Sequence, residues 1–219
     1  MTKARFEIAF EGDPFEDGEI DVRDLAPTLL AFGNVVQTAN KALNGDRADA
    51  RLKVAATDQG SFVAALTMDV GWLTDMLDAM SAHPQRVVAA DQLMDLLIKA
   101  GSIVGGGTIV LFAAIKALKG KRPEKVEARG DGTTEITVNQ STFVVDDRTV
   151  ALLQDLPTRE AVEDLGAKAA HVDGLDNLRI GTDSEEVEAV RLARTDLPSL
   201  KVPPEPDEPD TEITHRDAW

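Results

Sequence analysis

The sequence predicts an α+β protein, in which helices and strands occupy separate stretches of the chain. Apolar and polar residues alternate over residues 5–12, which is the two-residue period of a half-buried strand. Apolar residues then recur every three or four positions over residues 24–45, which is the period of a helix facing a core. From residue 125 the chain returns to short alternating runs separated by turn residues. We therefore expect an N-terminal β-α-β-β unit, a helical middle, a second small α+β unit and an acidic, proline-rich C-terminal tail.

The first predicted unit begins with the strand RFEIAFEG and the helix DLAPTLLAFGNVVQTANKALNG. Asp21 or Asp24 can cap the start of this helix, and Gly45 can end it. Pro27 is expected in the first turn, where its missing N–H costs little. The strands RLKVAAT and SFVAALTMDV, joined by the turn DQG, complete a small sheet covered by one helix.

The predicted helical middle contains WLTDMLDAM, then QRVVAADQLMDLLIK, then the glycine-rich stretch AGSIVGGGTIVLFAAIKALKGKR over residues 100–122. A phosphate-binding loop is disfavoured, because no Lys-Ser/Thr pair follows the glycines and the preceding residues indicate a helix. Residues 100–115 carry no charge, but a membrane-spanning helix needs about 20 apolar residues. We favour a buried helix or helical hairpin, with a membrane-associated or oligomer-forming segment as the alternative.

A dense group of basic residues directly follows this apolar run. Such a group can bind anionic lipid headgroups, or it can simply end a helix in solvent, where cations meet the helix dipole favourably. The predicted contact residues for a membrane or a partner are Gly105, Gly106, Gly107, Phe112, Lys116, Lys119, Lys121, Arg122 and Lys125.

The second predicted unit has the strands KVEARG, TEITVN and STFVV and the helices DRTVALLQDL and TREAVEDLGAKAA. Asp146 and Asp147 are expected to cap the first of these helices. A short strand, LDNLRIG, and a helix, DSEEVEAVRLAR, follow. We expect one domain over residues 1–122, a second over 123–195, and a solvated tail over 196–219, which holds five of the ten prolines.

The composition excludes several kinds of site. The formal net charge of −16 disfavours nucleic acid as a partner. The chain has no cysteine, so it has no disulfides, thiolate metal sites or cysteine nucleophiles. His83, His171 and His215 stand apart from matched carboxylates, so we expect no metal and no cofactor. The N-terminus lacks the apolar region of a secretion signal, so a cytoplasmic protein is expected, with membrane association as the alternative.

The segments DLAPTLLAFGNVVQTANKAL, GSFVAAL and GGGTIVLFAAIKALKG, in this order, resemble uncharacterised bacterial proteins, some of them from phages or mobile elements. The resemblance covers the chain up to about Ile180. Its motifs are structural, so it implies no functional residue. Such relatives continue into a further β-rich module, whereas this chain stops at Trp219.

No catalytic constellation is visible in the sequence. We therefore expect a non-enzymatic interaction or assembly protein of bacterial or phage origin that associates with a protein partner or with itself. The helices around residues 72–118 would supply its core or an oligomer contact. One alternative is a membrane-associated effector that uses the glycine-rich run and the basic residues on an anionic membrane surface. Another is an enzyme of unrecognised type, since catalytic groups can lie far apart in sequence.

Overall fold

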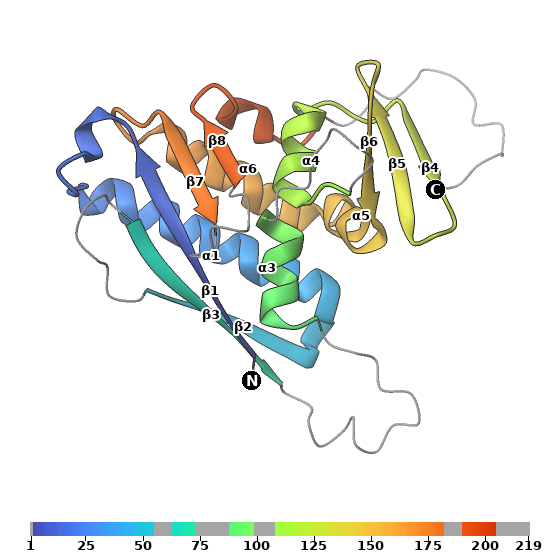
Figure 1. Cartoon of the computed structure of the whole chain (residues 1–219), viewed down its shortest axis with the longest axis horizontal. Coiled ribbons are helices and arrows are strands. Elements are labelled where there is room, and N and C mark those ends of the chain that lie inside the picture. The colour runs from blue at the N-terminus through green and yellow to red at the C-terminus, as the bar shows by residue number, and fades with distance from the viewer. Residues whose placement is uncertain (1, 55–62, 73–87, 99–107, 182–189, 205–219) are drawn as a thin grey trace.

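The computed structural model describes residues 2–54, 63–72, 88–98, 108–181 and 190–204 of the chain (Figure 1). Helices and antiparallel sheets together form an α+β fold, which confirms the predicted class. The strands are β1 (Thr2–Glu11), β2 (Ala48–Val54), β3 (Val63–Trp72), β4 (Lys125–Ala128), β5 (Thr133–Val138), β6 (Ser141–Asp146), β7 (Asn177–Gly181) and β8 (Val190–Ala193). The helices are α1 (Val22–Asn44), α3 (Ala90–Ile98), α4 (Leu111–Leu118), α5 (Asp147–Gln154) and α6 (Leu156–Ala170), with short 3-10 helices η1 (Asp13–Phe15), η2 (Gly45–Arg47) and η3 (Leu197–Leu200).

The larger sheet has five strands in the order β2-β3-β1-β7-β8, and every neighbouring pair is antiparallel. In β1, Phe6, Ile8 and Phe10 are buried on the face that carries the core. Ile8 lies opposite Ala64 of β3 and opposite Ile180 of β7, so the buried row continues across the sheet. The elements β1, α1, β2 and β3 follow in the predicted order.

The strands β7 and β8 were not expected in this sheet. They fall within the range 123–195 predicted for the second unit, yet β7 pairs with β1. The predicted boundary near residue 122 therefore does not coincide with the division between the two sheets. The helix predicted over residues 183–194 is wrong at Val190–Ala193, which form β8. Val190 and Leu192 are buried there, and this alternation extends the apolar face of the sheet.

Helix α1 lies along the buried face of the larger sheet and also packs against α6. Asp21 caps its start, because Asp21 Oδ1 accepts a hydrogen bond from Arg23 N at 2.8 Å. Gly45 ends it with a φ of 59°, a conformation that glycine adopts without strain. Pro27 lies inside the helix and not in its first turn, because the helix already begins at Val22. The missing N–H of Pro27 therefore removes one backbone hydrogen bond within the helix.

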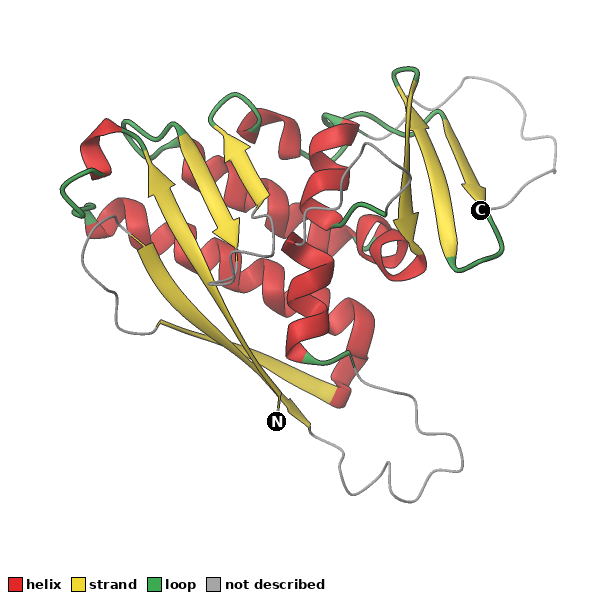
Figure 2. Cartoon of the chain, viewed as in Figure 1, coloured by secondary structure: helices red, strands yellow, loops and turns green. Residues whose placement is uncertain are grey.

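The smaller sheet has the order β4-β5-β6, and Figure 2 shows it on the opposite side of α4 and α5 from the larger sheet. Ile136, Val138, Phe143 and Val145 form its buried face against α4 and α5. Asp146 caps α5 by accepting a hydrogen bond from Thr149 N at 2.6 Å, as the sequence predicted. These packed faces hold the smaller sheet against α4 and α5.

The second half of the glycine-rich stretch is the buried helix α4. Phe112 has 0% of its surface exposed, and its ring stacks on that of Phe32 with centroids 6.4 Å apart. Trp72, expected to begin a helix, is the last residue of β3. The rest of WLTDMLDAM and the glycines Gly105–Gly107 lie outside the described residues. Within the described ranges, no helix has both the length and the apolar character required to cross a membrane.

The predicted tail begins later than residue 196. Leu197 and Leu200 of η3 are buried, and η3 packs against α6. The two elements meet closely at Gly166, where a Cβ atom would lie 3.0 Å from the carbonyl oxygen of Leu197. Residues 205–219 of the predicted tail lie outside the described residues.

Candidate functional site

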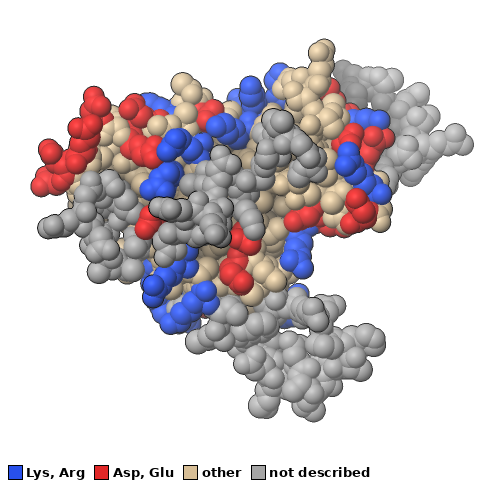
Figure 3. Space-filling model, viewed as in Figure 1, with Lys and Arg blue, Asp and Glu red and all other residues tan. Residues whose placement is uncertain are grey.

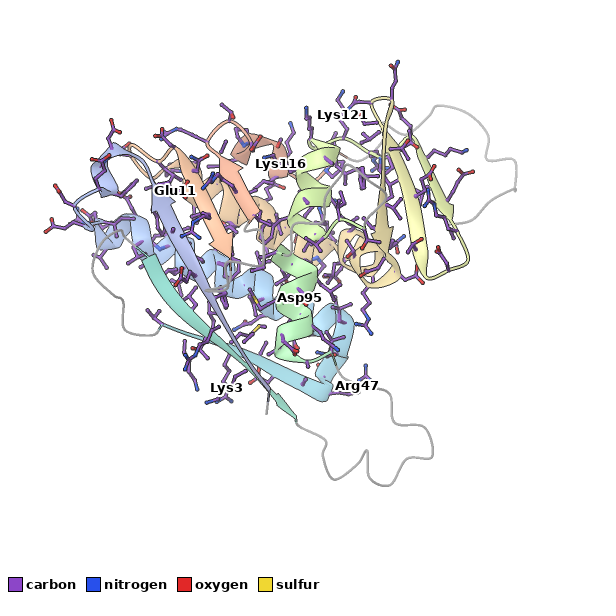
Figure 4. The ribbon with its side chains drawn as sticks, in the orientation of Figure 1. Lys3, Glu11, Arg47, Asp95, Lys116 and Lys121 are labelled. Atoms are coloured by element: carbon purple, nitrogen blue, oxygen red, sulfur yellow. The ribbon has the colours of Figure 1, made fainter. Side chains whose placement is uncertain are left out.

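The predicted basic contact residues lie at the end of α4 and in the chain that follows it, and most of them have local partners. Lys116 Nζ lies 2.7 Å from Asp196 Oδ2 (Figure 4). Lys121 Nζ donates a hydrogen bond to Asn139 Oδ1 at 2.7 Å, and Arg122 Nε donates to the carbonyl oxygen of Pro204 at 3.1 Å. These contacts tie α4 to the smaller sheet and to the segment after η3.

The remaining predicted contact residues do not form one patch with these. Lys125 pairs with Glu127 on the exposed side of β4, with 2.8 Å between Nζ and Oε1. This pairing raises the pKa of Lys125 through the hydrogen bond to Glu127. Lys119 is exposed and ends α4 with a φ of 51°. Phe112 is buried in the core, so its side chain is not available to a membrane or a partner in this fold. Gly105, Gly106 and Gly107 fall outside the described ranges.

Lys121 and Arg122 instead border a groove of about 550 Å³, which we call the α4–β4 groove. It lies between the end of α4, the strands β4 and β5, helix α5, the start of α6 and the segment after η3. This volume is within the range of pockets that bind ligands. Most of its wall is apolar, with Leu118, Val126, Ile136, Leu153, Leu156 and Val202 among the lining residues.

The polar residues that line the α4–β4 groove are Lys121, Arg122, Gln154 and Arg159. No acidic side chain of the described chain lines it, although the protein has 39 acidic residues against 23 basic ones. Figure 3 shows acidic side chains in several separate groups on the visible face, so the absence of carboxylates from the groove is a local feature. A groove with cations and without carboxylates favours an anionic occupant.

Arg159, near the start of α6, is the most buried cation of the α4–β4 groove. Only 5% of its surface is exposed, and its Nε atom has no hydrogen-bond partner among the described residues. Its Nη2 atom donates to the carbonyl oxygen of Lys201 across a long distance of 3.4 Å. Burial lowers the pKa of Arg159, and the nearby charge of Glu163 opposes this effect. The guanidinium thus has more donors than the surrounding protein satisfies.

The segment Lys201–Pro204 runs along one side of the α4–β4 groove. Val202 and Pro203 contribute to its wall. The segment is held by its backbone: Val202 N donates to Glu163 Oε2 at 2.8 Å, and Arg122 and Arg159 bind the carbonyl oxygens of Pro204 and Lys201. Basic residues of the groove therefore already bind the backbone of a segment outside the helices and strands.

Strand β4 contributes Val126 to the wall of the α4–β4 groove. All four of its residues are exposed, and within the described chain it pairs only with β5. Val126 of β4 is 53% exposed and Leu156 of α6 is 54% exposed, although both are large apolar residues. The groove thus has an unpaired strand edge and uncovered apolar walls beside its cations.

Other parts of the described structure offer less. A second hollow of about 340 Å³ lies between α1 and β2, but Asn40, which lines it, is engaged in a buried hydrogen bond to Ala48. His171 Nδ1 lies 2.6 Å from the carbonyl oxygen of Ala167 in its own helix. His83 and His215 are outside the described residues. Among the residues that the structure places, no group of histidine and carboxylate side chains could hold a metal ion.

Charged side chains on the outer face of the larger sheet pair with one another. Glu11 lies 3.2 Å from Arg179 and 3.2 Å from Arg191, which ties β1 to β7 and β8 (Figure 4). These pairs have a structural explanation, because they join the three strands on the side away from the core.

The sequence pattern indicates Lys121 and Arg122 as contact residues but does not indicate Val126, Leu156 or Arg159. Their signal is weak because the groove combines residues from positions 118 to 203, and no short motif spans it. Among these residues, Leu156 has the clearest sequence signal for an exposed side chain, because it is an apolar residue between the helix cap Asp155 and Pro157.

Comparison of the chain with protein-family models, with curated proteins and with solved structures finds no match in any of the three. The resemblance to bacterial and phage-associated proteins therefore stays a prediction. The described part of the chain is thus an α+β protein with a cationic, largely apolar groove.

Proposed function

We propose that the protein is a non-enzymatic interaction protein that binds its partner in the α4–β4 groove. The observation that carries this proposal is the composition of the groove, which is apolar and cationic within a chain of net charge −16. Exposed apolar side chains beside an unpaired strand are typical of a surface that a partner covers. The predicted interaction function is thus assigned to a surface that includes Lys121 and Arg122 but not the buried Phe112.

The occupant that fits best is an extended protein segment with apolar and acidic side chains. Charge complementarity supports acidic residues, because Lys121, Arg122 and Arg159 line the groove and no carboxylate of the described chain does. The free edge of β4 supports an extended backbone, because a strand can be added where peptide groups are unpaired. The segment Lys201–Pro204, bound by Arg122 and Arg159, provides an example of such a contact within the chain itself.

A second copy of the chain can supply such a segment, which agrees with the predicted self-association. Bacterial or phage origin is kept as part of the proposal on the sequence resemblance alone. The membrane alternative has no comparable support in the described residues, because Lys116 and Lys125 are ion-paired and Phe112 is buried. Flotation with anionic liposomes tests that alternative directly.

A selection from a random library of displayed peptides, performed on the intact protein, tests the proposal. We expect peptides whose binding is lost in Val126→Glu and Leu156→Glu, since each change places a charge on an apolar wall of the groove. Val22→Glu and Leu30→Glu are matched controls, because these side chains are 68% and 71% exposed on α1, away from the groove. If the control variants lose binding as well, or if no selected peptide depends on the groove, the proposal is wrong.

Light scattering coupled to size-exclusion chromatography identifies the source of the segment. If the partner is a second copy, the wild-type protein forms an oligomer that Val126→Glu and Leu156→Glu dissociate. If the wild-type protein is monomeric at high concentration while selected peptides bind the groove, the partner is a different protein.

A further inference from the structure

We propose that Arg159 is the residue that makes the α4–β4 groove selective for a carboxylate, by binding an Asp or Glu side chain of the docked segment. This inference rests on the proposed function and adds to it the chemical group that the groove recognises. The observations that carry it are the burial of Arg159, the unsatisfied donor on its guanidinium and its position in the groove wall.

Arg159 lacks the partner that a buried guanidinium ordinarily has. Arginine is almost never fully buried unless it is paired with an anion. Arg159 is 95% buried, since 5% of its surface is exposed, but it forms no ion pair with a carboxylate of the described residues. Glu163, one turn along α6, directs Oε2 to the backbone N–H of Val202 at 2.8 Å instead.

The other two basic residues of the groove are exposed, so water can satisfy the donors that their hydrogen bonds leave over. Lys121 donates to Asn139 at 2.7 Å, and Arg122 Nε donates to Pro204 at 3.1 Å. Arg159 has only the 3.4 Å contact to the Lys201 carbonyl, and its Nε is without an acceptor in the described chain. An anion that enters the groove therefore gains most from Arg159.

A carboxylate suits this position because of its geometry. Its two oxygens can accept parallel hydrogen bonds from the guanidinium of arginine, and such charge-assisted pairs are stronger than neutral hydrogen bonds. The amide of Gln or Asn has the same shape but offers one acceptor and no charge. A site with an unmet donor rejects a ligand that cannot satisfy it, so the groove distinguishes Glu from Gln.

The test uses a groove-binding peptide from the library selection in two forms, one with Glu and one with Gln at the same position. We expect the wild-type protein to bind the Glu form about tenfold to a hundredfold more tightly, as measured by fluorescence anisotropy. In Arg159→Met, the two forms should bind equally, and selections on this variant should still enrich apolar residues but not Asp or Glu. Arg159→Lys keeps the charge but loses the planar fork, so its preference should be intermediate.

Arg148→Met is the matched control, because Arg148 is exposed on α5 and does not line the groove. It should keep the full preference for Glu. If Arg159→Met also keeps this preference, or if groove-dependent peptides from the wild-type selection contain no excess of acidic residues, the inference is overturned while the proposed function stands. If no selected peptide depends on the groove, the proposed function falls, and the inference falls with it.

Discussion

Two buried asparagines join the end of α1 to other parts of the chain. Asn40 Nδ2 donates to the carbonyl oxygen of Ala48 at 2.8 Å, which fixes the start of β2. The amide of Asn44 donates to Asn40 Oδ1 and to the carbonyl oxygen of Val88, and its Oδ1 accepts from Val88 N at 2.7 Å. The side chain of Asn44 therefore satisfies both backbone polar groups of Val88, which precedes α3.

Replacing Asn44 with Leu should destabilise the protein strongly. The change leaves the N–H and C=O of Val88 buried without partners, and each such group costs about 1–3 kcal/mol. We expect the free energy of unfolding to fall by about 3 kcal/mol or more, as measured by urea denaturation. Asn34→Leu, on the exposed side of the same helix, is the control and should change it little. Similar losses in both variants would show that the buried network contributes nothing.

Arg159→Met should have the opposite effect on stability. Arg159 forms no ion pair within the described residues, and its Nε has no hydrogen-bond partner there. Replacing this buried cation removes its desolvation cost, and the stem of Met can fill the same space. We expect the free energy of unfolding to rise by roughly 1 kcal/mol, although peptide binding loses its selectivity. A clear loss of stability in thermal and urea unfolding would mean that Arg159 serves the fold and not a ligand.

Residues whose role depends on local sequence could be predicted, and residues whose role depends on distant partners could not. Asp21 and Asp146 cap helices that begin within three residues of them, so the sequence pattern predicts both. Asn44 binds Val88, which is 44 residues away, and Arg159 binds Lys201, which is 42 residues away. No short sequence motif predicts contacts between residues so far apart in the chain.

Two glycines inside helices show how packing decides the effect of the same substitution. In α1, a Cβ atom at Gly33 would meet only the side chain of Leu52, at an ordinary 3.8 Å. In α6, a Cβ atom at Gly166 would lie 3.0 Å from the carbonyl oxygen of Leu197 and 3.1 Å from the side chain of Leu200. The second glycine is therefore required by the close contact with η3.

Gly33→Ala should stabilise the protein, because Ala costs about 1 kcal/mol less than Gly in a helix. Gly166→Ala should destabilise it, because the added methyl group forces η3 away from α6. The two melting temperatures, measured by circular dichroism against the wild type, should thus shift in opposite directions. A rise in both would show that η3 has room to move.

At the level of elements, the sequence predicts those whose periodicity is long and unbroken. Helix α1 and strand β1 have such patterns, and both form as expected. Strand β8 has only four residues. The sequence DSEEVEAVRLAR around it has acidic residues at its start and basic residues at its end, which is the charge order of a helix aligned with its dipole. Pairing with β7 overrides that local preference, because it buries Val190 and Leu192.

The charge of the whole molecule should make its stability depend on salt. Acidic side chains gather at the end of the molecule that carries η1 and the start of α1 (Figures 1 and 3). Glu16, Asp17 and Glu19 are exposed there, in a chain of net charge −16. Repulsion between such charges destabilises the compact state, and it is screened as the Debye length falls.

We therefore expect the melting temperature to rise by a few degrees between about 0.01 and 0.1 M NaCl, as the Debye length falls from about 30 to 10 Å. Neutralising Glu16, Asp17 and Glu19 together should raise the melting temperature at low salt and weaken its salt dependence. Glu11→Gln is the contrast, because it removes the partner of Arg179 and Arg191 and should lower stability. A melting temperature that falls with salt would mean that ion pairs outweigh the net repulsion.

For the whole molecule, the sequence predicts the class of fold but not the sharing of strands between its two halves. The pattern of LDNLRIG indicates a strand, and β7 forms there. Nothing in that pattern shows that Ile180 will lie opposite Ile8, because β7 pairs with a strand more than 160 residues earlier in the chain. The α4–β4 groove could not be predicted for the same reason, because its lining residues come from positions 118 to 203 and meet only in the folded chain.

The pairing of β1 with β7 also bears on how the nascent chain matures. Synthesis at about 5–20 residues per second separates the end of β1 from the start of β7 by roughly ten to thirty seconds. Throughout this interval, the edge of β1 that will receive Leu178 and Ile180 has no native neighbour, and an open apolar strand invites pairing with other chains. Translation speed and chaperone supply should therefore govern the soluble yield of this protein more than its final stability does.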